Sequence, residues 1–294
     1  MQHNDGAPME IWQIGNVSIT RIIETEDTSM TAEIMLPDAT PERVLAIGWL
    51  RPHFVDDDGR LISSIYSLLL ESQGKRLVVD TCLGNDKPRA VPDWNQRQGR
   101  FLDEIAAAGF PRESVDYVVC THLHPDHVGW NTMLVNGAWV PTFPNARYLF
   151  SQADWDWLDQ APVTPLGDYC GDSVRPIIAA GLAELITPDH AITDEVQLVS
   201  TPGHSPGHLS VRIESGSDRA IITGDLMHHP CQIAQPKWCS NFDFDQGRAL
   251  TTREDFIAGH SGEPVLVIGT HFATPSAGYI EPDGATHRLV LTRK

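Results

Sequence analysis

The chain has 294 residues, and 39 acidic against 21 basic side chains give it a formal net charge of −18 at pH 7. Hydrophobic residues make up 41% and charged residues 20%, which is typical of a folded protein and excludes disorder. Such an acidic surface repels phosphate groups, so nucleic acid and anionic membranes are excluded as partners. We expect a single domain over residues 1–294 with a flexible tail over 1–10, because this length can bury a core without disulfides.

The cysteines and the N-terminus favour a cytoplasmic location. Five cysteines without a CxxC pair form neither a disulfide framework nor a zinc ribbon, so we expect them to be reduced. The first ten residues are polar and acidic and lack the basic stretch and apolar run of a secretory signal. Apolar stretches elsewhere are too short to span a membrane.

Strands are predicted where apolar and β-branched residues alternate or run together. In chain order the predicted strands cover residues 11–23, 62–70, 76–79, 115–120, 196–200, 208–213, 220–222 and 265–268. The break Ser72-Gln73-Gly74-Lys75 predicts a hairpin between the second and third of them.

Helices and loops fill the intervals. An apolar face at helical spacing predicts a helix over residues 98–108, and Thr251 with Glu254 forms a capping-box pattern that predicts the start of another. Residues 24–58 and 81–97 are rich in Pro, Asp and Asn, so we interpret them as long loops that form lids or binding walls. The Met, Leu and Trp residues of the first loop look exposed, which makes it the candidate contact of a homodimer.

The strongest motif is an HxHxDH sequence formed by His122, His124, Asp126 and His127 directly after a predicted strand. In an extended segment His122 and His124 point to the same side, and Pro125 then ends the extension. The motif therefore offers two pairs of ligands aimed at neighbouring points. Imidazole and carboxylate ligands suit zinc, and they also accept manganese, cobalt or iron.

Three further candidates lie where later predicted strands end. His204 follows the strand over 196–200, Asp225 follows 220–222, and His271 follows 265–268. Polar residues in such positions gather at one edge of an α/β fold, where its sites form. Together with the motif they make seven candidate metal ligands.

In order and context these seven residues resemble the full ligand set of the dinuclear metallo-β-lactamase-fold hydrolases, and the resemblance extends from about residue 64 to 273. It implies an α/β fold, an αββα sandwich of two mixed β-sheets flanked by helices. The ligand assignment that it implies is His122, His124 and His204 for the first metal, Asp126, His127 and His271 for the second, and Asp225 as the bridge between them. Two divalent metal ions are thus expected, with zinc first and manganese, cobalt or iron as alternatives.

The resemblance also implies a mechanism. A hydroxide shared by the two metals would attack the substrate, and Asp126 would shuttle the proton to the leaving group. Asp80 matches a supporting aspartate at the end of an early strand, while His208 is interpreted as structural.

Residues and segments that this chain has or lacks narrow the choice among the branches of the family. Asp225 argues against true β-lactamases, the acidic charge against nucleases, and the short segment after His271 against glyoxalase II. The remaining match is to esterases, N-acyl-homoserine lactonases and methyl-parathion-hydrolase-like enzymes. The lactonases carry a tyrosine three residues after the bridging aspartate, where this chain has His228. We consider His228 a catalytic candidate that could donate a hydrogen bond to an oxyanion, or simply a residue at a strand exit.

Aromatic residues on segments expected near the site favour an apolar or aromatic small-molecule substrate. They are Trp130, Trp155, Trp157, Trp238, Phe242 and Phe244. The function expected is metal-dependent hydrolysis of an ester, lactone or phosphotriester. The alternatives are a hydrolytic dehalogenase of halogenated aromatics, a mononuclear-iron persulfide dioxygenase, and a binding module with a degenerate metal site.

Overall fold

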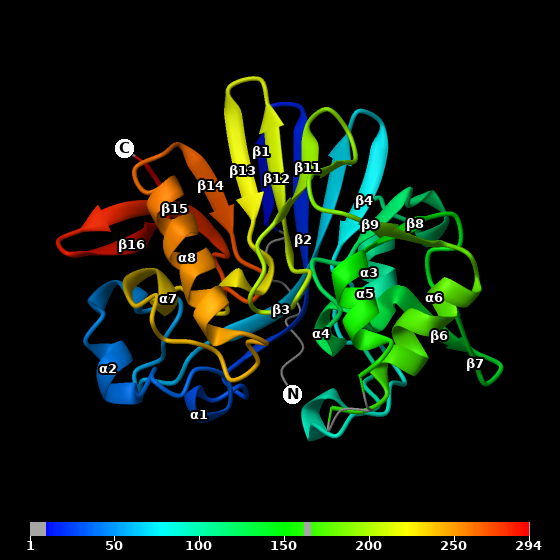
Figure 1. Cartoon of the computed structure of the whole chain (residues 1–294), viewed down its shortest axis with the longest axis horizontal. Helices are drawn as coiled ribbons and strands as arrows, with labels where there is room; N and C mark the ends of the chain where they lie inside the picture. The colour runs from blue at the N-terminus through cyan, green and yellow to red at the C-terminus, as the bar shows by residue number, and fades with distance from the viewer. Residues whose placement is uncertain (1–9, 162–165, 294) are drawn as a thin grey trace.

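A computed structural model describes residues 10–161 and 166–293, so the tail predicted over 1–10 lies almost wholly outside the described residues. Two seven-stranded β-sheets face each other, and helices cover their outer faces, as Figure 1 shows. Both sheets are mixed, which confirms the predicted α/β sandwich.

The first sheet is built from the N-terminal half of the chain. Its strands, in spatial order, are β1 (Ile11–Ile14), β2 (Val17–Asp27), β3 (Ser63–Ser72), β4 (Lys75–Val79), β5 (Tyr117–Val119), β8 (Arg147–Ser151) and β9 (Ala183–Ile186). Strands β1 to β4 pair antiparallel, and β4, β5, β8 and β9 pair parallel. A separate hairpin joins β6 (Thr132–Val135) to β7 (Ala138–Pro141).

The second sheet comes from the C-terminal half. Its strands, in spatial order, are β10 (His190–Ala191), β11 (Val196–Ser200), β12 (Leu209–Ser215), β13 (Asp218–Ile222), β14 (Val265–Ile268), β15 (Ala277–Asp283) and β16 (Thr286–Val290). Only β13 and β14 pair in parallel; the other neighbours are antiparallel.

The helices are short except for one. They are α1 (Ala32–Met35), α2 (Pro41–Leu45), α3 (Phe101–Ala107), α4 (Pro125–Val128), α5 (Gln152–Leu158), α6 (Arg175–Ala179), α7 (Cys231–Ala234) and α8 (Gln246–His260). Helices α3, α5 and α6 lie on the side of the first sheet, and α1, α2, α7 and α8 on the side of the second (Figure 1). Within the described ranges, no helix has the length and apolar character needed to cross a lipid bilayer.

Apolar side chains on both faces of the strands explain the layered arrangement. Between the sheets, Leu70 and Val119 of the first pack in the same cluster as Val211 and Ile222 of the second. Two further clusters lie under the outer helices, one against each sheet. Each sheet is therefore buried on both faces, which is why its strands read as nearly continuous apolar runs.

The strand directions bring the predicted ligands to one edge of the sandwich. Strands β11, β13 and β14 run in the same direction, as do β4, β5 and β8 of the other sheet. The sheets also meet at this edge, because the N–H of Ser64 at the start of β3 donates to the carbonyl of His271. The turns after these strands thus face one another across the junction of the two sheets.

The structure confirms the predicted hairpin and corrects one helix start. Gln73 and Gly74 form the turn between β3 and β4 with φ angles of 51° and 74°, a conformation that a glycine adopts without strain. The capping-box prediction is wrong: α8 begins at Gln246, and Asp245 caps it by accepting from the N–H of Arg248. Thr251 lies inside the helix and donates its hydroxyl to the Gly247 carbonyl.

The interpretation of residues 24–58 as an exposed loop is also wrong in part. Strand β2 continues to Asp27, and the segment then forms α1 and α2. Met35, Leu36, Leu50 and Phe54 are buried beneath the second sheet, so these apolar residues serve the core rather than an exposed surface. The homodimer stays a prediction.

Gly129 makes a close backbone approach that generates a testable prediction. Its N–H donates to the carbonyl of Cys82, and a Cβ at this position would overlap the backbone of Leu83. We expect Gly129→Ala to lower the free energy of unfolding by about 1–3 kcal/mol, the range for overpacking, in urea denaturation. The control is Gly259→Ala in α8, where the added methyl meets open space and should stabilise the chain by about 0.5–1 kcal/mol. Equal effects of the two substitutions would contradict the close approach.

Candidate metal centre

Three histidines from two sheets converge at the edge. After β5 the backbone bends at Thr121 and His122, His124 is extended (φ −93°, ψ 160°), and Pro125 then begins α4. His204, in the turn after β11, places its Nε2 3.2 Å from His122 Nε2 and 2.9 Å from His124 Nδ1. Each pair of ring nitrogens is therefore close enough to share one bound cation.

A second group lies beside the first. The short helix α4 carries Asp126 and His127, and the turn after β14 carries His271. Asp126 Oδ2 lies 3.7 Å from His127 Nε2 and 3.5 Å from His271 Nε2. His127 Nε2 is buried and has no hydrogen-bond partner among the described residues. A buried ring nitrogen without a partner is costly unless something binds it.

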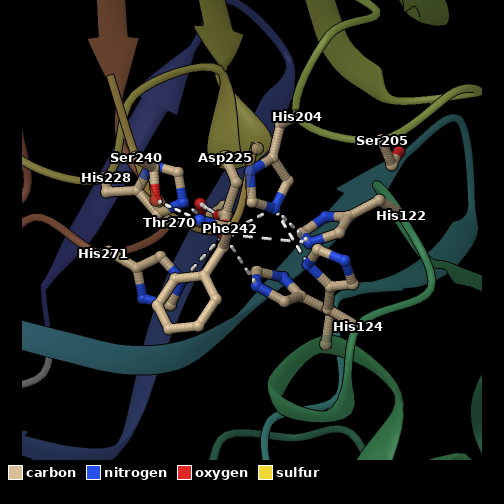
Figure 2. Close-up of polar contacts among 12 residues, drawn as sticks. His122, His124, His204, Ser205, Asp225, His228, Ser240, Phe242, Thr270 and His271 are labelled. Atoms are coloured by element: carbon tan, nitrogen blue, oxygen red, sulfur yellow. Dashed lines mark hydrogen bonds and ion pairs between the residues drawn. The ribbon is translucent and has the colours of Figure 1, made fainter. Parts of the chain in front are cut away.

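Asp225, in the turn after β13, lies between the two groups. Its Oδ2 is 3.1 Å from Nε2 of His271, 3.4 Å from that of His127, 3.5 Å from that of His204 and 3.7 Å from that of His122. Figure 2 shows this carboxylate with His122 and His204 on one side and His271 on the other. The structure thus brings all seven sequence-predicted ligands together.

The electrostatics of the cluster suit a cation. Burial, reinforced by neighbouring imidazoles, holds the pKa of His122 and that of His124 well below the usual range, so both rings are neutral. Burial also opposes protonation of His127 and His271, but nearby carboxylates, Asp225 foremost, outweigh it and raise both pKa values. A divalent ion would take the place of the protons that the carboxylates favour on His127 and His271, because imidazoles bind a metal in their deprotonated form, so this set of imidazoles and carboxylates fits a transition metal.

Asp80 orients His127, as the sequence predicted. It follows β4 with a φ of 56°, and its carboxylate accepts hydrogen bonds from the N–H and the hydroxyl of Thr121, at 2.8 and 2.9 Å. His127 Nδ1 lies 2.8 Å from Asp80 Oδ2, so the ring donates there and turns Nε2 toward Asp225.

His208 has the structural role predicted for it. Its Nε2 accepts from the backbone N–H of Asp225 at 2.8 Å, and its Nδ1 lies 2.9 Å from the hydroxyl of Thr201. Burial and the neighbouring His204 lower its pKa to about 3, so the ring stays neutral and can accept that bond. Both nitrogens are engaged, which leaves neither for a metal.

Two buried carboxylates beside His204 were missed by the sequence analysis. Asp243 Oδ1 lies 3.1 Å from His204 Nδ1, and Asp154 accepts from the hydroxyl of Ser205 at 2.9 Å and from the N–H of Gly207 at 2.6 Å. Burial raises the pKa of Asp154 to about 6 despite these bonds. No spacing rule identifies either residue, because they lie 39 and about 50 positions from the turn they contact.

Comparison with known proteins identifies the family of this fold and ligand set. The model of the metallo-beta-lactamase superfamily matches residues 62–281, which include all seven candidate ligands. The chain belongs to the metallo-beta-lactamase superfamily.

Two groups of curated relatives are similar over part of their length. An N-acyl homoserine lactonase of Bacillus cereus is 27% identical over 174 residues, covering 54% of this chain and 61% of the relative. The N-acyl homoserine lactonase AttM of Rhizobium radiobacter is 26% identical over 135 residues, covering 45% of this chain and 48% of the relative. The match therefore spans less than two thirds of these relatives.

Two solved structures share the fold over nearly the whole chain. AidC, a dizinc quorum-quenching lactonase in complex with the product N-hexanoyl-L-homoserine, superposes with a TM-score of 0.79 at 19% identity, covering 97% of this chain and 98% of AidC. The hydrolase AbOPH superposes with a TM-score of 0.76 at 22% identity, covering 98% and 99%. At these identities the likeness establishes the fold alone.

His228 lies beside the candidate metal centre, and the contacts of its two ring nitrogens bear on its role. Its ring is buried, and its Nε2 lies 3.5 Å from Asp225 Oδ2, too far for a hydrogen bond. Neither Nδ1 nor Nε2 has a hydrogen-bond partner among the described residues. Burial lowers its pKa to about 3, so the ring is neutral and carries one N–H. The adjacent His229 instead contacts the Phe54 carbonyl at 2.7 Å and is structural.

A pocket opens directly above the metal centre. Its floor includes His124, Asp126, His204, Asp225, His228 and His271. Its walls are mainly apolar, with contributions from Met30, Met35, Ile65, Trp94, Trp157 and Phe242. Residues from both predicted loop segments, 24–58 and 81–97, therefore form walls, as the sequence analysis expected.

The six aromatic residues singled out from the sequence divide into two sets. Trp157 and Phe242 line the pocket, and the exposed Phe244 packs edge-to-face on Trp157 with ring centroids 5.8 Å apart. Trp130 and Trp238 are buried in the two outer cores, and Trp155 is half-buried against one of them. Half of the set thus belongs to the pocket region and half to the cores.

The contacts of Asp80 generate a second prediction. In Asp80→Asn the backbone can keep its positive φ, but one carboxylate oxygen becomes an amide that cannot accept from Thr121 or His127. We expect the free energy of unfolding to fall by about 1–3 kcal/mol, because a buried donor is left unpaired, in urea denaturation of the metal-stripped protein. Unchanged stability would contradict these contacts. The control is Asn136→Asp, which exchanges the same two residue types in the opposite direction. Asn136 also has a positive φ but lies on an exposed turn.

Proposed function

We propose that this chain is a hydrolase that opens a lactone or cleaves a related ester bearing an apolar substituent, with two divalent metal ions, zinc first, held by the seven residues. One observation carries the proposal: a single oxygen of Asp225 faces both ligand groups at the floor of an apolar pocket. The Nε2 of His127 supports it, because this buried nitrogen faces carboxylates at 3.4 and 3.7 Å and has no hydrogen-bond partner among the described residues.

One ion would be held by His122, His124 and His204, and the other by Asp126, His127 and His271. Asp225 would be shared by the two ions. When bound there, two such ions supply Lewis acidity for a carbonyl oxygen and lower the pKa of a water that serves as nucleophile. The chain's own residues then position the substrate, stabilise charge and move protons.

Asp126 is placed to carry a proton. Its Oδ2 faces His127 and His271, and the side chain is partly exposed at the pocket floor. Its other oxygen can take a proton from the attacking water and pass it to the leaving oxygen of the substrate. Hydrolysis then proceeds without a covalent intermediate.

His228 is placed to stabilise the oxyanion. Its neutral ring has one N–H without an acceptor, and it borders the pocket beside Asp225. A donor that is already oriented in a buried site loses little by reorganisation when negative charge develops on the substrate oxygen. This is the position at which the sequence departs from the lactonase pattern.

The pocket walls favour an apolar substituent. Trp157, Phe242 and Met30 offer contact surface for an acyl chain or an aromatic ring, and burial of each methylene contributes about 0.8 kcal/mol. The names of the partial relatives, N-acyl homoserine lactonases, support an acyl lactone as the substrate class. Phosphotriesters and halogenated aromatics stay as further predictions for the same site.

The metal and the substrate are tested together. We expect two metal ions per chain by plasma mass spectrometry, loss of hydrolysis after chelation, and its return with Zn²⁺. Among N-decanoyl-homoserine lactone, N-butanoyl-homoserine lactone, p-nitrophenyl acetate and paraoxon, the decanoyl lactone should have a kcat/KM at least about tenfold above that of the butanoyl lactone, because more methylenes are buried. One iron per chain without hydrolysis would instead favour the persulfide dioxygenase alternative, and no metal would favour a binding module.

The role of His228 is tested separately. We expect His228→Ala to lower kcat about tenfold or more through loss of one donor to the oxyanion, with two metals still bound. His228→Gln keeps an N–H donor and should recover part of the loss. Kinetics of the alanine variant equal to those of the unmodified protein would exclude the role, and metal loss in both variants would make His228 a ligand.

A further inference from the structure

A fully buried arginine of α8 connects two of the turns that carry the metal centre. Arg253 Nε donates to the carbonyl of Leu226 at 3.0 Å, in the turn between Asp225 and His228. Its Nη2 lies 3.4 Å from Asp243 Oδ2, and Asp243 in turn faces His204 Nδ1. One guanidinium therefore contacts both the turn that carries the proposed bridging ligand and the residue that orients His204.

Asp243 determines which nitrogen of His204 faces the centre. Its carboxylate accepts from the N–H of Ser240 at 3.0 Å and lies 3.1 Å from His204 Nδ1. The imidazole must donate to the carboxylate from Nδ1, because a carboxylate only accepts. The lone pair of Nε2 is then directed toward His122 and His124, and Figure 2 shows the three rings converging there.

Helix α8 and the two residues that precede it hold the same turn. The N–H groups of Phe244 and Asp245 donate to the carbonyls of His204 and Gly203, at 3.0 and 2.9 Å. Thr252 donates its hydroxyl to the Pro202 carbonyl at 2.6 Å. The turn after β11 is thus tied to the start of α8 at three successive residues.

Stability alone does not account for a buried guanidinium–carboxylate pair. Replacing such a pair with apolar residues is often neutral or stabilising, because two charges lose their hydration when they are buried. Arg253 makes a third contact, because its Nη1 donates to the Pro236 carbonyl at 2.7 Å. Its guanidinium therefore joins three separate segments, which contain Leu226, Pro236 and Asp243. This geometry needs the planar, multidentate donor that only arginine provides.

We propose that Arg253 and Asp243 are positioning residues that hold His204 and the Asp225 turn in the positions needed for metal binding. The inference rests on the metal centre of the proposed function. Asp243 acts on one ligand group by fixing the tautomer and orientation of His204. Arg253 acts on both groups, because it anchors Asp243 and the backbone next to Asp225.

The test measures Zn²⁺ affinity of the full-length, metal-stripped protein by competition with a chromophoric chelator. The unmodified chain should bind two Zn²⁺. Asp243→Ala should weaken one site about 10–100-fold, the usual effect of losing an orienting partner, and leave the other within about threefold. Asp243→Asn keeps one acceptor for His204 and should lose less. Arg253→Met should weaken both sites.

A matched control removes a buried guanidinium elsewhere. Arg89 forms a two-pronged ion pair with Asp172 and also donates to the carbonyl of Pro88, and neither partner lies in a ligand-bearing turn. Arg89→Met should lower the melting temperature as Arg253→Met does, yet leave both Zn²⁺ affinities within about threefold of the unmodified chain.

The outcomes separate the inference from the proposed function. Two-zinc binding by the unmodified chain together with unchanged affinities in Asp243→Ala and Arg253→Met would overturn the inference alone. Equal losses in Arg89→Met and Arg253→Met would also overturn it, because the effect would then be general destabilisation. No zinc binding by the unmodified chain would overturn the proposed metal centre and the inference with it. Should Asp243→Ala not fold, Asp243→Asn gives the same comparison.

Discussion

The carboxylate of Asp225 is the contact on which the arrangement of the site depends. Its Oδ2 faces ring nitrogens of five histidines that come from both sheets, and its Oδ1 accepts from the hydroxyl of Thr270 at 2.8 Å. A buried carboxylate is costly unless it is paired and hydrogen-bonded. The two sheets must therefore pack so that their strand ends meet around this group, and the order and direction of the strands provide that meeting point.

Each turn at this edge is held by a residue from another part of the chain. Asp80 holds the turn after β5, His208 holds the backbone of Asp225, and Asp154 and Asp243 lie on either side of the His204 turn. Asp80, His208 and Asp243 contact a candidate ligand or its backbone, and Asp154 contacts Ser205 and Gly207, which follow His204. The candidate centre is hydrogen-bonded on its buried side, while residues from the segments 24–58 and 81–97 line its open side.

The sequence analysis selected seven candidate ligands that the structure brings together, because their signal is local. The HxHxDH spacing places four of them in six positions, and the other three directly follow apolar runs that are easily recognised as strands. Asp243 and Arg253 have no such signal, since their relation to His204 and Leu226 exists only after α8 packs against the second sheet. Family resemblance supplied the pairing of the ligands, which spacing alone left open.

Two errors followed from local sequence patterns. Thr251 and Glu254 fit a capping pattern, but Asp245 already caps the helix six residues earlier, and a local pattern cannot tell a helix start from a polar face. In the same way, Met35 and Leu50 are irregularly spaced and looked exposed, although tertiary packing buries them beneath the second sheet. The true start of the helix is set by a contact of Asp245 three residues along the chain, whereas the burial of Met35 and Leu50 comes from contacts distant in sequence.

The position of the site across the junction of the two sheets links ion binding to folding. His122 and His204, in one ligand group, are 82 positions apart, so an ion held by that group would cross-link the N-terminal and C-terminal halves of the chain. The unfolded chain cannot offer these ligands together, and an ion that binds only the folded state stabilises it by about 4 kcal/mol at a free concentration of a thousand times Kd. The resistance of this protein to heat and proteolysis should therefore follow the availability of metal in its surroundings as well as the quality of its core.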